Sequence, residues 1–304
     1  MAYTSNDKIL ASHYNGFVVD MNELYADTNS GGTTEATGGY GYGQSSISTV
    51  SVGTTITAAQ WNALLGAMDD CSVHQGTAIT CPPSVSAGDQ ITAFDSTAPN
   101  VPGFTTADIA ADISSLRANR FNVDFSEGSV STTTTETYTP TWDTTLTQTI
   151  TATFADWDEM RYFFNAGGKV RFSFSFTGTP SNTTENNWVA MASAVDVVSF
   201  DYTRAQSSGG VGTTGVGLYD LTSSDQQAYS YVPPGYSSEQ YLIDARLNGA
   251  AGSANQIIFT LSFVTPSGGD TISLDLNSEL ALFENDVGAI QVNSPTMNAG
   301  TIST

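Results

Sequence analysis

The residues of this sequence most capable of chemistry are a glycine-rich segment and a small acidic cluster. Residues 210–215 read G-V-G-T-T-G and match the G-x-G-x-x-G spacing of dinucleotide-binding loops. Such a loop needs a strand before it and a helix after it, because the helix N-terminus binds the pyrophosphate. Here a Gly/Ser-rich stretch precedes the segment and V-G-L-Y, without helical spacing, follows it. We therefore interpret the segment as a flexible hairpin tip and predict no cofactor.

The acidic cluster consists of Asp156, Asp158 and Glu159, at the start of a predicted short helix over residues 155–165. A glycosidase needs two carboxylates that flank the scissile bond. Acidic residues also stabilise a helix N-terminus, by about 0.3–1 kcal/mol each, and this second reading is the one we prefer. The G-x-S-x-G pattern of serine hydrolases does not occur in the sequence. We predict no catalytic residue and no enzymatic activity.

Metal and disulfide chemistry have weak support in the sequence. The two histidines, His13 and His74, have no carboxylates at ligand spacing, and residues 284–286 (E-N-D) lack a calcium-loop pattern. We therefore predict no metal site. We interpret Cys71 and Cys81 as free thiols, with a disulfide between them left open.

Several tyrosines stand in Gly- or Pro-rich segments and are candidates for binding sugars or partner proteins. They are Tyr40, Tyr42, Tyr229, Tyr231 and Tyr236. An exposed tyrosine buries a large contact area at low entropic cost. The alternative is that these rings anchor their own loops.

The charge of the chain excludes several classes of partner. The 304 residues include 30 acidic and only 8 basic ones, for a net charge of −22. Nucleic acid and anionic membranes need clustered Lys and Arg, so we expect neither as a partner. No window approaches the roughly 18 apolar residues of a membrane span. The polar start resembles no secretion signal, which leads us to expect synthesis in the cytoplasm.

An internal duplication organises the first part of the chain. Residues 9–22 and 56–69 share the pattern I-x-A-x-x-[Y/W]-N-x-[F/L]-[V/L]-x-x-M-[N/D] at a constant offset. The apolar residues of each copy recur at i, i+3, i+4 and i+7, which predicts two helices. Thr57 and Gln60 form a capping-box pattern at the start of the second. A third helix is expected over 107–119, capped by Thr105. Together they predict a small helical region over 1–125.

The periodicity changes to two after a Ser/Thr-rich stretch at 126–136, which we interpret as a linker, with an edge strand as the alternative. Residues 169–177 alternate apolar and polar side chains without a break. Further strands are expected at 195–202, 241–247, 256–264, 272–276 and 280–283. The fold class is therefore α+β, mainly β, with an antiparallel, jelly-roll-like β-sandwich over 137–290. Residues 291–304 are expected to form an extended C-terminal tail.

Two stretches resemble a known group of proteins. One is W-D-E-M-R-Y-F-F-N-A-G-G-K-V-R-F at 157–172; the other is the duplicated helix, followed by G-Y-G-Q at 41–44 and H-Q-G-T at 74–77. Both resemble segments of virion structural proteins of tailed bacteriophages, especially marine and cyanobacterial ones. The resemblance implies a component of the tail, neck or fibre apparatus, and it supplies no catalytic residues.

The expected function is therefore a non-enzymatic structural role in the virion. We expect a homo-oligomer that also contacts other virion proteins, with the helical region as its docking unit. One alternative is a carbohydrate- or receptor-binding fibre domain that recognises a host-surface glycan. Others are a capsid decoration protein and, least favoured, a depolymerase.

Overall fold

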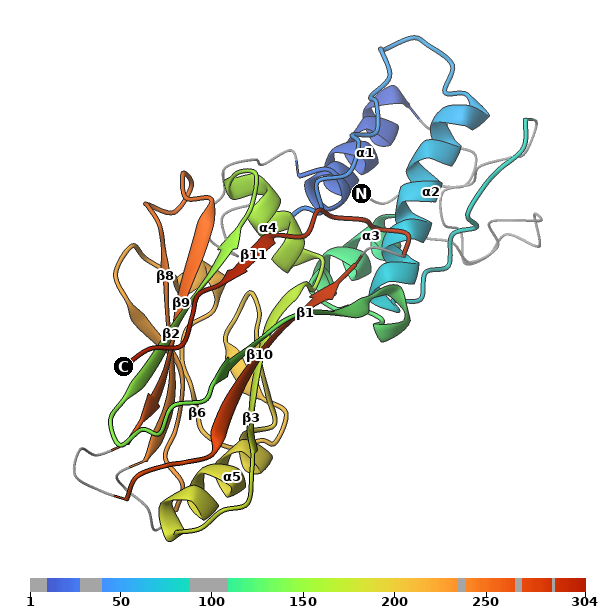
Figure 1. The fold of residues 1–304 in the computed structure, drawn as a ribbon. Helices are drawn as coiled ribbons and strands as arrows, with labels where there is room; N and C mark the ends of the chain where they lie inside the picture. Colours follow the sequence, from blue (N-terminus) through green and yellow to red (C-terminus); the bar gives the residue numbers. More distant parts are fainter. Residues whose placement is uncertain (1–9, 28–39, 88–108, 235–238, 266–269, 286–287) are drawn as a thin grey trace. The chain divides into compact units, whose positions relative to one another are not determined.

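The protein forms two compact units in the computed structural model, which describes residues 10–27, 40–87, 109–234, 239–265, 270–285 and 288–304. The first unit comprises Met1–Ser129 and Asn285–Val292 and carries helices; the second comprises Val130–Glu284 and Asn293–Thr304 and carries two β-sheets (Figure 1). The predicted α+β class with a β-sandwich is confirmed. Among the helices described, none is long and apolar enough to cross a membrane.

The helical unit contains α1 (Ala11–Tyr25), α2 (Ala58–Gln75), α3 (Ile109–Ala118) and the short 3-10 helix η2 (Phe125–Glu127). The apolar stripes that the spacing predicts form its core, except that Phe17 is only half-buried: Tyr14, Val18, Met21, Trp61, Leu64, Leu65, Met68, Ile109, Ile113 and Leu116 are all buried. The predicted cap of the third helix, Thr105, lies outside the described residues.

Helix α2 has both of its ends specified by local sequence. Thr57 accepts a hydrogen bond from the backbone N–H of Gln60, and the Gln60 side chain accepts one from the N–H of Thr57 at 2.8 Å. This is the predicted capping box. The helix stops at Gly76, whose φ of 64° lies in the left-handed region that favours glycine.

The second unit is built from two antiparallel sheets. The first has the strand order β1 (Ser129–Tyr138), β10 (Asp275–Glu284), β3 (Lys169–Thr177), β4 (Val197–Phe200), β5 (Ala205–Ser207). The second has the order β11 (Thr296–Ala299), β2 (Leu146–Thr153), β9 (Gln256–Val264), β8 (Gln240–Leu247), β7 (Gln226–Tyr231), β6 (Thr213–Thr214). Along β3, β8 and β9 buried side chains alternate with more exposed ones, as expected for strands that cover a core on one face.

Aromatic rings from the two sheets meet in the sandwich core. Phe172 of β3 lies 5.0 Å from Phe259 of β9, centroid to centroid, and Phe174 lies 5.4 Å from Phe263. Such edge-on ring pairs add about 0.5–1.5 kcal/mol to the burial of the rings themselves. The strands that alternate most regularly in the sequence therefore face each other across the core.

Helix α4 (Trp157–Asn165) leads into β3 through a glycine corner. Gly167 has a φ of 84°, and a Cβ at Gly168 would lie 2.6 Å from the backbone oxygen of Phe163. Both positions thus require glycine, one for its backbone conformation and one for space. Phe164 packs against Phe200 at 5.7 Å, so the helix covers the inner face of the sheet that it joins.

Four boundaries differ from the sequence-based prediction. Most of the segment 126–136 is strand β1 at the edge of the first sheet, so the alternative interpretation, an edge strand, is confirmed and the linker is not, because β-branched threonines suit an extended backbone paired with β10. The expected strands at 272–276 and 280–283 correspond largely to one strand, β10, preceded by a bridge between Ile272 and Trp142. The expected tail contains β11, which pairs with β2 and so satisfies its backbone. Residues 285–292, placed at the sandwich boundary by sequence, belong to the helical unit.

Two further differences concern the sandwich. Helix α5 (Thr183–Val195) was not predicted, and it buries Trp188 against Phe174 and Phe263. The glycine-rich segment 210–215 follows β5 and contains β6, which belongs to the other sheet, so it is not a hairpin tip. A Cβ at Gly212 would lie 2.5 Å from the Tyr229 hydroxyl oxygen, which shows that close packing selects the glycine.

Candidate functional site

The acidic cluster at α4 serves the helix that it begins. Asp156 is the N-cap residue and accepts a hydrogen bond from the N–H of Glu159 at 2.9 Å. Asp158 pairs with the buried Arg161 at 2.5 Å, and Glu159 accepts a hydrogen bond from Asn293 at 2.9 Å. These contacts support the helix-stabilising interpretation, since Asp156 caps the helix, Asp158 forms an ion pair and Glu159 stands in the first turn, where a negative charge is favourable.

Most of the histidines and cysteines are buried in the helical core. His74 is buried beside Tyr42, with ring centroids 5.1 Å apart, while the Nδ1 atom of His13 accepts a hydrogen bond from the N–H of Leu10. Cys71 and Cys81 are both buried and form no disulfide, and burial raises the pKa of the Cys71 thiol well above its usual value. Within the described residues, no group of three potential ligands could hold a metal ion.

The candidate tyrosines are mostly structural where they are described. Tyr42 is buried and its hydroxyl hydrogen-bonds with Gln75 and the backbone oxygen of Arg120. Tyr229 is also buried and belongs to β7, as does Tyr231. Tyr40 accepts a hydrogen bond from Arg117 at 3.1 Å, and Tyr236 lies outside the described residues. The loop-anchoring interpretation therefore holds for Tyr42, and Tyr229 and Tyr231 are strand residues.

The duplicated asparagines make the same contact in both copies. The Asn15 side chain donates to the backbone oxygen of Val50 at 2.8 Å and accepts from the Val50 N–H at 2.8 Å. Asn62 makes the same pair of bonds to Val85, at 3.0 and 2.7 Å. We call each pair an asparagine clamp. In each, one side-chain amide satisfies both backbone groups of a loop residue, which fixes the loop against the helix.

A third clamp sets the path of the loop along α1. Asn22 forms the same two bonds, both at 2.8 Å, with Ile47. Asn15 and Asn22 are two helical turns apart, or about 10 Å, and three extended residues from Ile47 to Val50 span about the same distance. The segment 47–50 therefore runs antiparallel to α1.

The loop partners of the clamps carry a signal that the sequence reading missed. Residues 50–58 read V-S-V-G-T-T-I-T-A and residues 85–93 read V-S-A-G-D-Q-I-T-A. The clamped valine opens each copy. The position that corresponds to Ile47 in the second copy is Pro82, which has no N–H to donate. This explains why the clamp of Asn22 has no counterpart there.

We expect each clamp to protect its own valine from hydrogen exchange. Asn15→Ala should expose the Val50 amide and cost about 1–3 kcal/mol of local stability, because two buried or half-buried backbone groups lose their partner. Asn62→Ala should do the same at Val85 and leave Val50 protected. Peptide-resolved hydrogen exchange on the two variants measures both, and each variant is the control for the other. Loss of protection at both valines in either variant would show that the helical unit opens as a whole.

The starts of α1 and α2 meet at one end of the helical unit. Tyr14 packs edge-on against Trp61 at 5.1 Å, and its hydroxyl donates to the backbone oxygen of Gln60 at 2.9 Å. One end of the unit is thus formed by the first turns of both helices and by the loop that precedes α2. We call this the uncharged end, because the described residues that form it, 10–19 and 47–68, contain no Asp, Glu, Lys or Arg.

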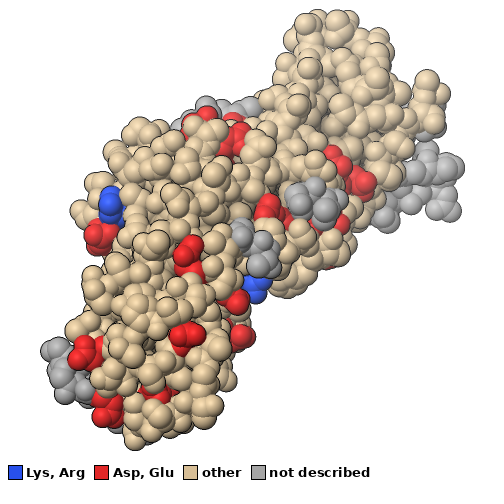
Figure 2. All heavy atoms as spheres, in the orientation of Figure 1, with Lys and Arg blue, Asp and Glu red and all other residues tan. Residues whose placement is uncertain are grey.

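Large apolar side chains are exposed at the uncharged end. Val52 is 91% exposed and Leu10 is 55% exposed. Val19, farther along α1, is 51% exposed. In Figure 2 the part of the helical unit that carries this end shows neither acidic nor basic atoms, whereas acidic side chains are scattered over the sandwich. A surface without charge in a chain of net charge −22 loses little by being removed from water.

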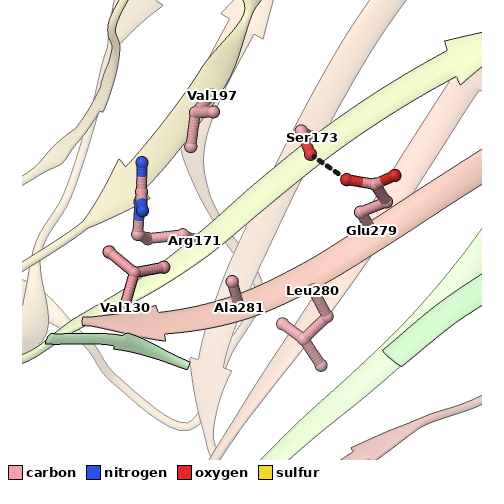
Figure 3. Close-up of a pocket in the computed structure, with 7 residues that line it drawn as sticks. All are labelled: Val130, Arg171, Ser173, Val197, Glu279, Leu280 and Ala281. Carbon is pink, nitrogen blue, oxygen red and sulfur yellow. Dashed lines mark hydrogen bonds between the residues drawn. The ribbon is translucent and has the colours of Figure 1, made fainter. Parts of the chain in front are cut away.

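A hollow of about 180 Å³ lies on the outer face of the first sheet. Its lining is Val130, Arg171, Ser173, Val197, Glu279, Leu280 and Ala281 (Figure 3). Ser173 donates to Glu279 at 3.4 Å, while Arg171 extends away from that pair towards Val197. The lining carries one acidic and one basic side chain, Glu279 and Arg171.

The most strongly bound carboxylate of the sandwich is Glu185, at the start of α5. Its side chain is fully buried and accepts hydrogen bonds from the N–H and hydroxyl groups of both Ser181 and Ser273, at 2.6–2.8 Å. Burial alone would raise the pKa of this carboxyl, but the hydrogen bonds outweigh burial and lower the pKa to about 2. Asn182 caps the same helix by accepting from the Glu185 N–H. Glu185 thus ties α5 to the segment before β10.

Comparison with protein-family models, curated proteins and solved structures finds no match for this chain.

Proposed function

We propose that this protein is a non-enzymatic structural component of a tailed-bacteriophage virion, in the tail, neck or fibre apparatus. The observation that carries the proposal is the uncharged end of the helical unit, with Val52 and Leu10 exposed. An exposed apolar surface of this kind is typical of a site that another protein covers. The helical unit then docks onto a second virion protein, and the sandwich is the unit that projects or forms contacts between copies.

The sequence resemblance supports the same role independently of the uncharged end. The string at 157–172 spans α4, the glycine corner and the first residues of β3. Its apolar positions build the core, as with Phe163, Phe164 and Phe172, which are all fully buried. The string that carries the resemblance is therefore part of the framework of the fold, as expected if the shared property is a shape used in assembly. The burial of Tyr42 and Tyr229 removes two candidate rings from the alternative role in glycan binding.

We expect Val52→Asp to impair incorporation of the protein into particles. A charge at a covered apolar surface must be desolvated, so the amount in purified particles should fall at least tenfold. The matched control is Val232→Asp, which changes a 42% exposed valine of the sandwich unit. Quantitative mass spectrometry of purified particles, from cells that supply each variant in place of the wild type, measures incorporation. Absence of the wild-type protein from particles would refute the virion role, and equal incorporation of both variants would refute docking through the uncharged end.

A further inference from the structure

The four outer strands of the two sheets differ greatly in length. Strand β5 has 3 residues, β6 has 2 and β11 has 4, whereas β1 has 10. A strand at the edge of a sheet presents unpaired N–H and C=O groups, and short edge strands are one way in which proteins limit unwanted pairing. Three edges of this sandwich are short, and β1 is the long one.

Strand β1 also lacks the other usual protections of an edge. Its sequence, SVSTTTTETY, contains no Lys, Arg, Pro or Gly, and its β-branched residues favour an extended backbone. Exposed side chains occur along its length, with Val130 51% exposed and Thr135 and Thr137 also exposed. Among the described residues, no strand pairs with the outer side of β1.

The charge of β1 favours a second copy of the same strand as its partner. Glu136 is the one charged residue among the 10. In an antiparallel pair with a two-fold axis, the residue at the axis lies opposite its own counterpart; with Thr134 at the axis, Glu136 lies opposite Thr132 of the second copy. The two glutamates are then about 14 Å apart along the strand, at a rise of about 3.4 Å per residue. Like charges do not face each other, although each chain has a net charge of −22.

We propose that β1 pairs antiparallel with β1 of a second copy of this chain, which joins the first sheets of two copies across a two-fold axis. An isologous contact of this kind closes on itself, because each copy contributes the same surface. The main-chain hydrogen bonds supply the attraction and the strand edge supplies the geometry. The inference deepens the proposed function, on which it rests for its role in the particle, by naming the contact between copies.

The mass of the purified full-length protein tests the pairing without any virion. Sedimentation equilibrium of the wild type should give a dimer, and Thr135→Asp should raise the dissociation constant at least tenfold by placing two more like charges near the axis. Thr296→Asp, an exposed threonine on the β11 edge, is the matched control and should leave the constant unchanged. Equal unfolding midpoints for the two variants would show that both fold. A monomeric wild type, or equal weakening by both substitutions, would overturn the proposal.

Cysteine crosslinking tests the direction of the pairing. Single substitutions Val130→Cys, Thr134→Cys, Thr135→Cys and Thr137→Cys are oxidised under mild conditions, with the buried Cys71 and Cys81 left in place. Only a cysteine at the two-fold axis can reach its own counterpart, so Thr134→Cys should crosslink and the other three substitutions should not. Crosslinking at all four positions would indicate a parallel pair and overturn the antiparallel one. If the purified protein crosslinks as a dimer but is absent from purified particles, the virion role is refuted and the pairing of β1 still stands.

Discussion

Phe172→Ala should reduce the free energy of unfolding of the sandwich unit by about 3–5 kcal/mol, because it removes buried surface and leaves a cavity. Phe172 is fully buried and packs on Phe259 of the opposite sheet. Neither sheet can close the space by itself, since each strand is held in register by its neighbours. A loss of this size is a large part of the 5–15 kcal/mol that stabilises a typical domain.

Ser173→Ala is the matched control for this strand. Ser173 follows Phe172 directly but points to the outer face, where it donates a hydrogen bond of 3.4 Å to the exposed Glu279. A bond this long at the surface contributes little, so the control should cost less than about 1 kcal/mol. Denaturant unfolding of both variants, followed by circular dichroism in the strand region, gives the comparison. Equal destabilisation would mean that β3 is buried on both faces.

Glu185→Gln should lower the free energy of unfolding by about 3 kcal/mol at neutral pH, and the loss should shrink in acid. The folded-state pKa of Glu185 is lowered to about 2, from an ordinary value of 4.5. A lowered pKa contributes stability that is present above the unfolded-state pKa and is lost as pH falls through the folded-state value. The difference between wild type and variant should therefore be constant above about pH 5 and nearly vanish near pH 2.

The comparison of wild type with Glu185→Gln at each pH separates this carboxyl from the many others that titrate in the same range. The glutamine amide also places an N–H donor close to the N–H groups of Ser181 and Ser273, which in the wild type donate hydrogen bonds to the carboxylate. Glu279→Gln, at an exposed site, is the control and should show little difference at any pH. A difference for Glu185→Gln that does not change between pH 2 and pH 7 would show that size and shape, and not charge, hold α5 in place.

The regular strands and the first two helices could be predicted because their burial follows a short period. Residues 169–177 and 256–264 form β3 and β9 with the predicted bounds, since alternate side chains face one core. The capping box at Thr57 also predicted the start of α2, because its two residues lie within one helical turn. The contacts of the asparagine clamps were harder to predict from the sequence. Asn15 and Asn62 stood out as a repeated pair, but their valine partners lie 35 and 23 residues away.

The elements that sequence reasoning missed depend on distant partners. Helix α5 has a weak apolar pattern and is held by Trp188 in the aromatic core and by Glu185 on Ser273. For β1 the sequence left both a linker and an edge strand open, and the pairing with β10, far along the chain, decides for the strand. Strand β11 forms because β2 offers an edge.

The sequence by itself determined the fold class, the duplicated helices with their asparagines, and the absence of charge from residues 40–68. These properties are local, since periodicity and composition act over a few residues. Only the tertiary structure decided that the uncharged residues share one end with exposed Leu10 and Val52, and that β1 lies at a long, unprotected edge. Surfaces and edges arise from contacts between segments far apart in the chain, so short-range patterns do not encode them.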